Sequence, residues 1–231
     1  MVHLKNVHVF KIYCASSLFS ENLALEGEVR QSTIYQTFGA HFAIEGPANN
    51  DWNDGCSSTA AGRRTAWWGL LLPKLVYMTN IKLYYRGDKP DRMNDFRLYL
   101  SNTSVHASYK FRCYTDQGIA GYPDVTQDIN CNRLTKNVYF FNRRTSGEGA
   151  FVEICYIEIY GCWKGTWGLN CTNACPANCI DHHCYPGNGS CIWGCESRNC
   201  LYDKCDPNAG VCIDGCKHGF VGQNCNNGYC E

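Results

Sequence analysis

Cysteine constrains this chain more than any other residue type, because its 18 cysteines are distributed very unevenly. Five of them lie before residue 160, and the other 13 fall between Cys162 and Cys230. The last 70 residues are poor in aliphatic side chains, and a segment of that composition cannot fold around an apolar core without crosslinks. The distribution predicts two units: a longer one with an apolar core, followed by one held together by covalent bonds.

Closely spaced cysteines can also bind metal. Structural zinc sites, however, favour pairs of cysteines with two residues between them (C-x2-C), and the sequence contains no such pair. Disulfides explain the pattern better and predict an extracellular protein, either secreted or a cell-surface ectodomain. Residues 1–21 have a basic start and a semi-apolar stretch that His8 and Lys11 interrupt, so we interpret them as a degenerate signal. No apolar run reaches the length of a bilayer span, so insertion of this chain into a membrane is not expected.

Charge and motifs exclude several classes of function. The 21 basic residues balance the 21 acidic ones, so charge does not indicate nucleic acid as a partner. Hydrolase, metalloprotease, phosphate-loop and dinucleotide-binding motifs do not occur, and we expect that the protein is not an enzyme. Asn102, Asn170 and Asn188 begin N-x-S/T triplets, which predict a glycoprotein in a secretory setting.

The first unit, residues 22–161, is expected to be all-β. Its apolar residues alternate at period two, as half-buried strands require, and no capped amphipathic helix is predicted. Next to Cys155 the apolar residues change from even-numbered positions (Val152, Ile154) to odd-numbered ones (Ile157, Ile159), which predicts a β-bulge there. A β-sandwich follows most simply. The β-rich runs are residues 81–85, 96–100, 137–141 and 151–160.

The second unit, residues 162–231, contains an internal repeat. The segment Cys179-x4-Cys184-x6-Cys191-x3-Cys195 recurs 21 residues later as Cys200-x4-Cys205-x6-Cys212-x3-Cys216. In addition, the loops 163–168 and 217–222 share two glycines in register with an aromatic residue between them. Glycine at positive φ and a packed ring suit the tight hairpin that closes a small disulfide-linked module.

Six short motifs run through the first unit in a fixed order: Asn22-Leu23-Ala24-Leu25, Ala43-Ile44-Glu45-Gly46, Gly55-Cys56-Ser57, Ala66-Trp67-Trp68-Gly69, Arg86-Gly87-Asp88 and Glu153-Ile154-Cys155. Their order and approximate spacing resemble the fucolectin (F-type lectin) domain, a branch of the discoidin-like, galactose-binding-like jelly rolls. The resemblance implies a jelly-roll β-sandwich over residues 22–161. It also implies two disulfides, Cys56 with Cys155 and Cys113 with Cys131.

In that family a His and two Arg residues bind fucose, since a cationic fork can donate to several sugar oxygens. Here Arg86 and Asp88 match the family pattern, Ser58 stands at the His position, and Arg92 lies one residue short of the second Arg position. The resemblance therefore implies a ligand site with weakened or altered fucose binding. One alternative is that Arg86 and Asp88 only form an intradomain ion pair. The Arg86-Gly87-Asp88 tripeptide is also of the integrin-binding type, a second alternative.

Calcium is the only cofactor that the resemblance suggests. The family places it beside the Cys56 bridge, where Glu45, Pro47 and Asn49 would be the ligands in this chain. Pro47 offers only a carbonyl, and Tyr156 stands where the family has a Glu ligand. Calcium takes about six to eight oxygens and usually more than one carboxylate, so these residues offer fewer calcium ligands than the family site does.

The cysteine spacing of residues 162–230 resembles the short EGF-like repeats of multiple-EGF-domain proteins and class F scavenger receptors. Spacing alone leaves the connectivity open, but the EGF order leaves only Cys14 and Cys230 over, and the last repeat is expected to be truncated. The pairs implied by the EGF order are Cys162 with Cys171, Cys175 with Cys184, Cys179 with Cys191, Cys195 with Cys205, Cys200 with Cys212 and Cys216 with Cys225.

These features predict an extracellular recognition module. Its sandwich would bind carbohydrate as a lectin does and would be displayed on the EGF-like repeats, with a glycan or a cell-surface glycoprotein as partner. The alternative is a protein-binding adhesion or scavenger receptor ectodomain, part of a longer receptor chain, that binds no sugar.

Overall fold

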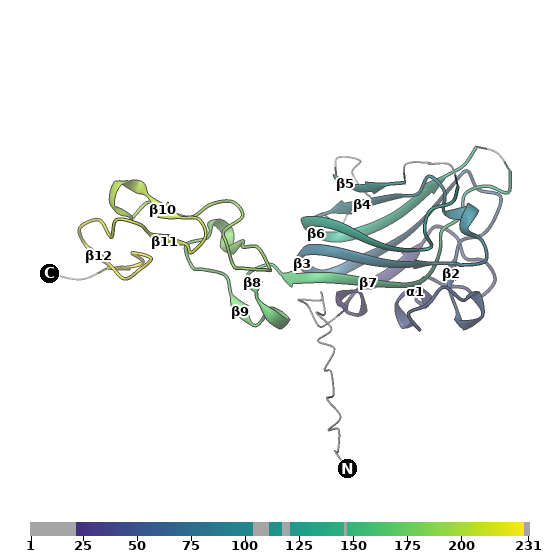
Figure 1. Cartoon of the computed structure of the whole chain (residues 1–231), viewed down its shortest axis with the longest axis horizontal. Helices are drawn as coiled ribbons and strands as arrows, with labels where there is room; N and C mark the ends of the chain where they lie inside the picture. Colours follow the sequence, from purple (N-terminus) through teal and green to yellow (C-terminus); the bar gives the residue numbers. More distant parts are fainter. Residues whose placement is uncertain (1–21, 104–110, 117–120, 146, 229–231) are drawn as a thin grey trace, which may run out of the picture.

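The computed structural model describes residues 22–103, 111–116, 121–145 and 147–228. It consists of a β-sandwich followed by a string of small cysteine-rich loops along the long axis of the molecule (Figure 1). The predicted fold class, an all-β sandwich with disulfide-rich modules after it, is confirmed. The N-terminal segment 1–21 and the two left-over cysteines, Cys14 and Cys230, lie outside the described residues.

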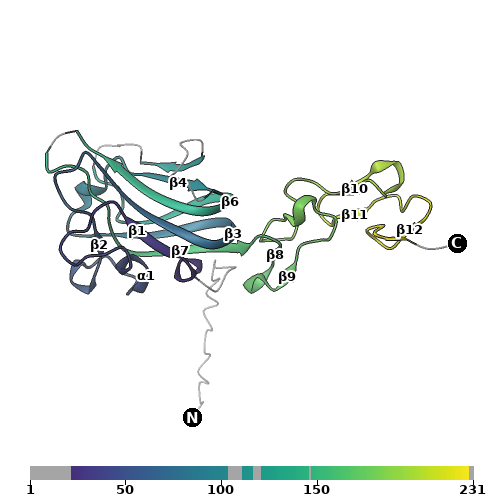
Figure 2. The same ribbon diagram turned by 180° about the vertical axis from the view of Figure 1, so that it is seen from behind.

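All strand pairs of the sandwich are antiparallel. They follow the order β2-β7-β3-β6-β4-β5, with β1 added alongside β3. Figure 2 shows β1, β2 and β7 on one side of the sandwich and β4 on the other. The strands are β1 (Glu28–Gln31), β2 (Ser57–Ser58), β3 (Thr65–Tyr85), β4 (Arg97–Ser101), β5 (Arg112–Thr115), β6 (Thr126–Arg143) and β7 (Glu153–Trp163).

Short helical turns connect these strands. A four-residue helix α1 (Phe42–Glu45) and the turn η2 (Trp52–Asp54) lie between β1 and β2, near the start of β7 (Figure 1). Asp51 caps η2, because its side chain accepts a hydrogen bond from the Asn53 amide at 2.9 Å. Two further 3-10 turns in the described part of the sandwich are η1 (Leu23–Glu26) and η3 (Pro90–Met93).

The long strand β3 shows how the apolar alternation builds the core. Trp68 and Leu70 point inward and are almost fully buried, and beyond residue 80 the inward set continues with Ile81 and Leu83. The inward positions change from even to odd at a β-bulge between Met78 and Asn80. Thr79 is the extra residue there, because no residue of β6 or β7 pairs with it in the strand register. This bulge keeps one face of the strand on the core along its whole length.

A second bulge lies at Cys155, as predicted. Tyr84 pairs with Tyr156 and Tyr85 with Ile154, so Cys155 is the extra residue of β7. The shift lets Ile154 and then Ile157 face the core, and both are 0% exposed. The parity switch in the sequence therefore has a direct structural cause.

Eight disulfides link the described cysteines, in the same pairs that the two resemblances implied. Two lie in the sandwich and six in the tandem. They are Cys56–Cys155, Cys113–Cys131, Cys162–Cys171, Cys175–Cys184, Cys179–Cys191, Cys195–Cys205, Cys200–Cys212 and Cys216–Cys225.

The cysteine-rich tandem repeats in its backbone as well as in its sequence. The turns η6 (Ile180–His182) and η7 (Leu201–Asp203) contain the equivalent left-handed residues Asp181, with φ of 56°, and Tyr202, with φ of 57°. Short hairpins close the modules, as the Gly-aromatic-Gly loops predicted. The remaining elements are β8 (Thr166–Trp167), η5 (Leu169–Cys171), β9 (Asn173–Ala174), β10 (Cys205–Asp206), β11 (Val211–Cys212), β12 (Phe220–Val221) and β13 (Asn227–Gly228).

The sandwich and the tandem meet at an aromatic joint. β7 runs on to Trp163, so Cys162 lies inside the last strand of the sandwich. Beyond it, the imidazole of His183 lies 5.6 Å from the ring of Tyr77 in β3 and 4.3 Å from the ring of Trp193. His183 is 2% exposed. The contact fixes the first module against the sandwich.

No helix in the described residues is long and apolar enough to cross a membrane.

Reduction is expected to separate the two units. The buried hydrophobic residues that cluster in the first module of the tandem are all cysteines, namely Cys175, Cys179, Cys184 and Cys191, whereas the sandwich has a large aliphatic and aromatic core. We therefore expect reductant to abolish all cooperative structure in the tandem and to leave the sandwich at least partly folded. Amide hydrogen exchange with and without reductant measures this, and retained protection in the reduced tandem would contradict it.

The joint is expected to weaken in acid. Burial lowers the pKa of His183 below 6.5, Lys164 lowers it further, and Asp181 opposes them. The folded state then binds fewer protons than the unfolded state, so the free energy of unfolding falls as the pH drops below about 6.5 and levels off below the folded-state pKa. The slope in that window is at most about 1.4 kcal/mol per pH unit. Thermal unfolding of the full chain at pH 7.5 and pH 5, compared with His183→Phe, measures it; an equal pH dependence in both proteins contradicts the assignment.

Candidate ligand-binding site

A cavity of about 630 Å³ opens on the sandwich beside the start of β7. Three of the four residues predicted to bind ligand, Ser58, Arg86 and Arg92, line it together. The fourth, Asp88, is paired with Arg86. The lining residues are Tyr35, Gln36, Phe38, Trp52, Ser58, Ala61, Gly62, Arg86, Lys89, Arg92, Gly147, Glu148, Phe151 and Glu153.

Separate elements bring these side chains together. Ser58 lies in β2, which pairs with the first residues of β7, and its register partner is Glu153. Arg86 follows directly after β3, and its backbone amide donates to the Glu153 carbonyl at 3.2 Å. Arg92 lies in η3, which begins at Pro90, a residue suited to a helix start. The side chain of Asn142 donates to the Arg92 carbonyl at 2.8 Å and holds this turn against β6.

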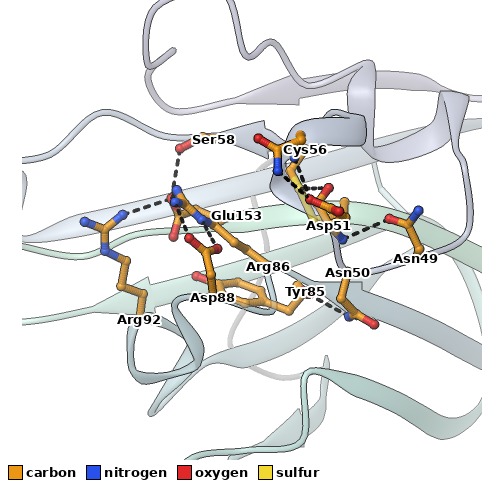
Figure 3. Close-up of polar contacts among 12 residues, drawn as sticks. Asn49, Asn50, Asp51, Cys56, Ser58, Tyr85, Arg86, Asp88, Arg92 and Glu153 are labelled. Carbon is orange, nitrogen blue, oxygen red and sulfur yellow. Dashed lines mark hydrogen bonds and ion pairs between the residues drawn. A yellow bond between two sulfur atoms is a disulfide. The ribbon is translucent and has the colours of Figure 1, made fainter.

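Glu153 lines the cavity, and its carboxylate joins the predicted residues Ser58, Arg86 and Arg92 (Figure 3). Its side chain is 1% exposed. A single oxygen, Oε1, accepts from Nη1 of Arg86 at 3.0 Å, Nη1 of Arg92 at 3.1 Å and Oγ of Ser58 at 3.3 Å. The other oxygen, Oε2, is buried and has no hydrogen-bond partner in the described part of the chain. One buried carboxylate thus fixes both guanidinium groups.

Aromatic rings cover the flat faces of both guanidiniums. The central carbon of Arg86 lies 3.8 Å from the centroid of the Trp52 ring, and that of Arg92 lies 4.0 Å from the centroid of Phe151. Phe38 in turn packs on Trp52 with 4.3 Å between centroids. Stacking of this kind favours a fixed, planar cation. The N–H edges of the two groups are then the parts available for polar contacts.

Asp88 and Arg86 form the intradomain ion pair that was considered as an alternative to sugar contact. Nε and Nη2 of Arg86 donate to the two carboxylate oxygens of Asp88 at 2.6 and 2.9 Å. These hydrogen bonds raise the pKa of Arg86 and lower the pKa of Asp88. The ion pair leaves Arg86 at the cavity wall, so the alternative and the ligand site are compatible.

Arg92 has a second carboxylate partner at the rim. Its Nη2 donates to Oε2 of Glu148 at 2.8 Å, and Glu148 is 72% exposed. Burial by itself would lower the pKa of Arg92, but Glu153 and Glu148 outweigh it and raise that pKa. Arg92, one residue short in the sequence pattern, therefore reaches the same cavity as Arg86.

The calcium ligands suggested by the resemblance do not fit a calcium cage. Glu45, the last residue of α1, and Pro47, on the turn after it, are both exposed. The side-chain oxygen of Asn49 accepts from the Asp51 amide at 2.9 Å, and a Cβ on Gly46 would lie 3.4 Å from the ring of Tyr156. An aromatic ring thus stands beside this turn where a carboxylate is needed. The described residues also contain no group of three or more His, Cys, Asp or Glu side chains that could hold a metal ion.

Glu153 was not among the site residues predicted from the sequence, and neither were Trp52 and Phe151. A signal for Glu153 was present, because a lone carboxylate in the apolar run from Phe151 to Cys155 is unusual for a buried strand. Its partners Arg86 and Arg92 lie 67 and 61 residues away in the sequence. Only the three-dimensional fold brings them together.

Comparisons with known proteins bear on this fold and site. No protein-family model matches the chain. Over 89 residues it is 30% identical to Fucolectin-1 of Anguilla japonica, a match that covers 36% of this chain and 50% of that protein. The chain therefore spans about half the length of the curated relative that it matches.

Solved structures with a similar fold include lectins and fucose-binding modules. A fucolectin from Morone saxatilis serum has a TM-score of 0.52 at 24% identity, covering 61% of this chain and 48% of that one. The lectin domain of lectinolysin, complexed with Lewis B antigen, has a TM-score of 0.52 at 20% identity and covers 62% of this chain and 97% of that one. A Streptococcus pneumoniae fucose binding module has a TM-score of 0.50 at 17% identity, with coverage of 61% and 94%.

The fold is a β-sandwich like that of these lectins and of the fucose-binding module. Part of its sequence is similar to a fucolectin. None of these comparisons tests the EGF-like interpretation of the tandem, which stays a prediction.

Loss of the Glu153 carboxylate is expected to destabilise the sandwich. Glu153→Ala leaves two largely buried guanidiniums and Ser58 without their common acceptor, and removal of one partner from a buried ion pair typically costs about 3 to 5 kcal/mol. Glu148→Ala removes a carboxylate that is 72% exposed, so its cost should stay below about 1 kcal/mol. Denaturant unfolding of both variants measures the difference; equal costs would show that Glu153 does not hold the site.

Proposed function

We propose that this protein is an extracellular recognition module that binds glycans in the cavity beside β7. The observation that carries the proposal is the pair of guanidiniums, Arg86 and Arg92, which are stacked on rings and fixed by one buried carboxylate at the wall of a 630 Å³ cavity. Sugar sites combine aromatic surfaces with a few fixed polar groups, and this cavity has both. The likeness to lectins in fold and partial sequence supports the same function.

Arg86 is the main donor in this proposal. It uses three N–H groups on Asp88 and Glu153, and a guanidinium has further N–H groups that can donate to sugar oxygens. Arg92 contributes in the same way from the opposite side of Glu153 (Figure 3). Both side chains are already ordered, so ligand binding would cost little additional side-chain entropy.

Fucose binding by this site should be weak or altered. Ser58, at the position of the family's His, is 1% exposed and donates to Glu153 rather than into the cavity. A lost hydrogen bond to a polar ligand typically costs about 1 kcal/mol or more. Arg92 occupies a shifted sequence position, so its N–H groups would meet a different part of the sugar.

The tandem would serve as an EGF-like stalk that carries the sandwich. Its six disulfides suit an oxidising, extracellular compartment. β7 extends from Glu153 at the cavity to Trp163 at the joint, a separation of roughly 30 Å for an extended strand of this length. The cavity would therefore lie at the end of β7 opposite to the stalk.

Integrin-type adhesion through Arg86-Gly87-Asp88 receives no support from this arrangement. The Arg86 side chain is 12% exposed, and its guanidinium is engaged by Asp88 of the same tripeptide. An integrin-type ligand presents its Arg and Asp to the partner rather than to each other. A glycan ligand requires only the free edge of Arg86.

Substitution of Arg86 tests the proposed site. We expect weak binding of galactose or fucose glycans by the natural chain, loss of that binding in Arg86→Ala, and partial recovery of fucose binding in Ser58→His. Arg30→Ala is a control of the same charge, because Arg30 is exposed on β1 and does not line the cavity. Calorimetry on the four proteins measures this. Tight fucose binding by the natural chain, or binding that Arg86→Ala leaves unchanged, would place the site elsewhere.

A further inference from the structure

The charged side chains at the cavity differ in how strongly solvent screens them. The side chains of Arg86, Arg92 and Glu153 are 12%, 20% and 1% exposed, whereas those of Asp88 and Glu148 are 55% and 72% exposed. Solvent and salt weaken the field of an exposed charge much more than that of a buried one. The two guanidiniums and Glu153 therefore dominate the potential in the cavity, and together they carry a net positive charge.

Both guanidiniums keep N–H groups for a ligand. Carboxylates accept three N–H groups of Arg86 and two of Arg92, and a guanidinium has further N–H groups beyond these. The two guanidiniums share the acceptor Oε1 of Glu153, so they lie next to each other (Figure 3). Lys89 lines the same cavity and adds a third cation. Neighbouring guanidiniums suit an oxyanion, because charge-assisted hydrogen bonds are the stronger kind.

Glu148 marks a position on Arg92 that an acidic group can occupy. Its Oε2 accepts from Nη2 of Arg92 at 2.8 Å at the rim of the cavity. Its backbone is held separately, because the Glu148 carbonyl accepts from the Gly62 amide at 2.8 Å. An ion pair with so exposed a carboxylate contributes little to stability. The Glu148 side chain can therefore leave Arg92 at small cost while its backbone stays in place.

We propose that the cavity prefers glycans that carry an acidic group, namely a sulfate or the carboxylate of an acidic sugar, and that this group replaces Glu148 on Arg92. The inference rests on the glycan-binding function proposed above and names the ligand class of the same cavity. It makes Glu148 an exchangeable occupant of the position that the acid of the ligand takes.

The exchange offsets the main cost of binding an anion. The acid of the ligand loses hydration when it enters the cavity, but on Arg92 it gains charge-assisted hydrogen bonds. Departure of Glu148 removes a like charge, and Glu153 cannot neutralise two guanidiniums at once. A neutral hydroxyl makes a weaker bond to the same N–H group and so competes poorly with the Glu148 carboxylate.

The experiment uses the full chain and a glycan array in which each neutral galactoside or fucoside is paired with a sulfated form and with a sialylated form. We expect the natural chain to bind the acidic members about tenfold more tightly than the neutral ones. Added salt should reduce this preference, and Arg92→Gln should abolish it. The sulfated and sialylated members show which acid the cavity takes.

Glu148→Gln tests the exchange, and Glu28→Gln is its matched control. Each variant removes one carboxylate that is paired with an arginine, and the two side chains are 72% and 73% exposed. Glu28 lies on β1 and does not line the cavity. We expect Glu148→Gln to raise the ratio of acidic to neutral binding about twofold to fivefold, and Glu28→Gln to leave it unchanged. An equal shift in both variants would mean that overall charge decides, which overturns the exchange.

The outcomes separate this inference from the proposed function. Absence of binding to every glycan, neutral or acidic, would overturn the proposed function itself. Binding of neutral glycans that equals or exceeds binding of acidic ones by the natural chain would overturn only the acid preference. If thermal unfolding shows that Arg92→Gln is not folded, the natural chain and the two glutamate variants decide the question, because those variants change only exposed side chains.

Discussion

The register between β2 and β7 is the constraint on which the rest of the site depends. The disulfide Cys56–Cys155 ties the chain just before β2 to the bulge of β7, so that Ser57 pairs with Ile154 and Ser58 with Glu153. A shift by one residue would turn the Glu153 side chain to the other face of the strand. The guanidiniums of Arg86 and Arg92 would then lose their common acceptor. The covalent link, the bulge and the cavity are therefore parts of one arrangement.

A buried carboxylate with two arginines is weak evidence for stability, because the cost of removing three charges from water can exceed their attraction. What the arrangement provides is order. Each guanidinium is held on one face by a ring and on two edges by carboxylates. Ligand binding would therefore cost little further side-chain conformational entropy. Replacement of a buried ion cluster by apolar residues is often neutral for stability, but here it would remove the fixed N–H edges. The cluster is better explained by recognition than by stability.

The sequence was informative wherever the determining pattern is local. Period-two alternation predicted the strands, and the parity switch predicted the bulge at Cys155. Family resemblance implied the disulfide pairs and a ligand site that includes Ser58, Arg86 and Arg92. In the structure these three residues line one cavity. The acceptor Glu153 and the stacking rings of Trp52 and Phe151 escaped prediction, because their contacts join segments that are distant in sequence. For the calcium ligands the sequence already placed Tyr156 where the family has a Glu, and the fold puts the ring of Tyr156 beside Gly46.

The two halves of the molecule are stabilised by different interactions, yet the strand β7 belongs to both. In the sandwich this strand contributes Ile157 and Ile159 to the apolar core, while at its end Cys162 forms the first disulfide of the tandem. The aromatic joint around His183 then fixes the first module against β3. A stalk that hung from a flexible linker would let the cavity point in any direction. Continuity of the strand through the joint instead holds the cavity and the tandem at opposite ends of β7.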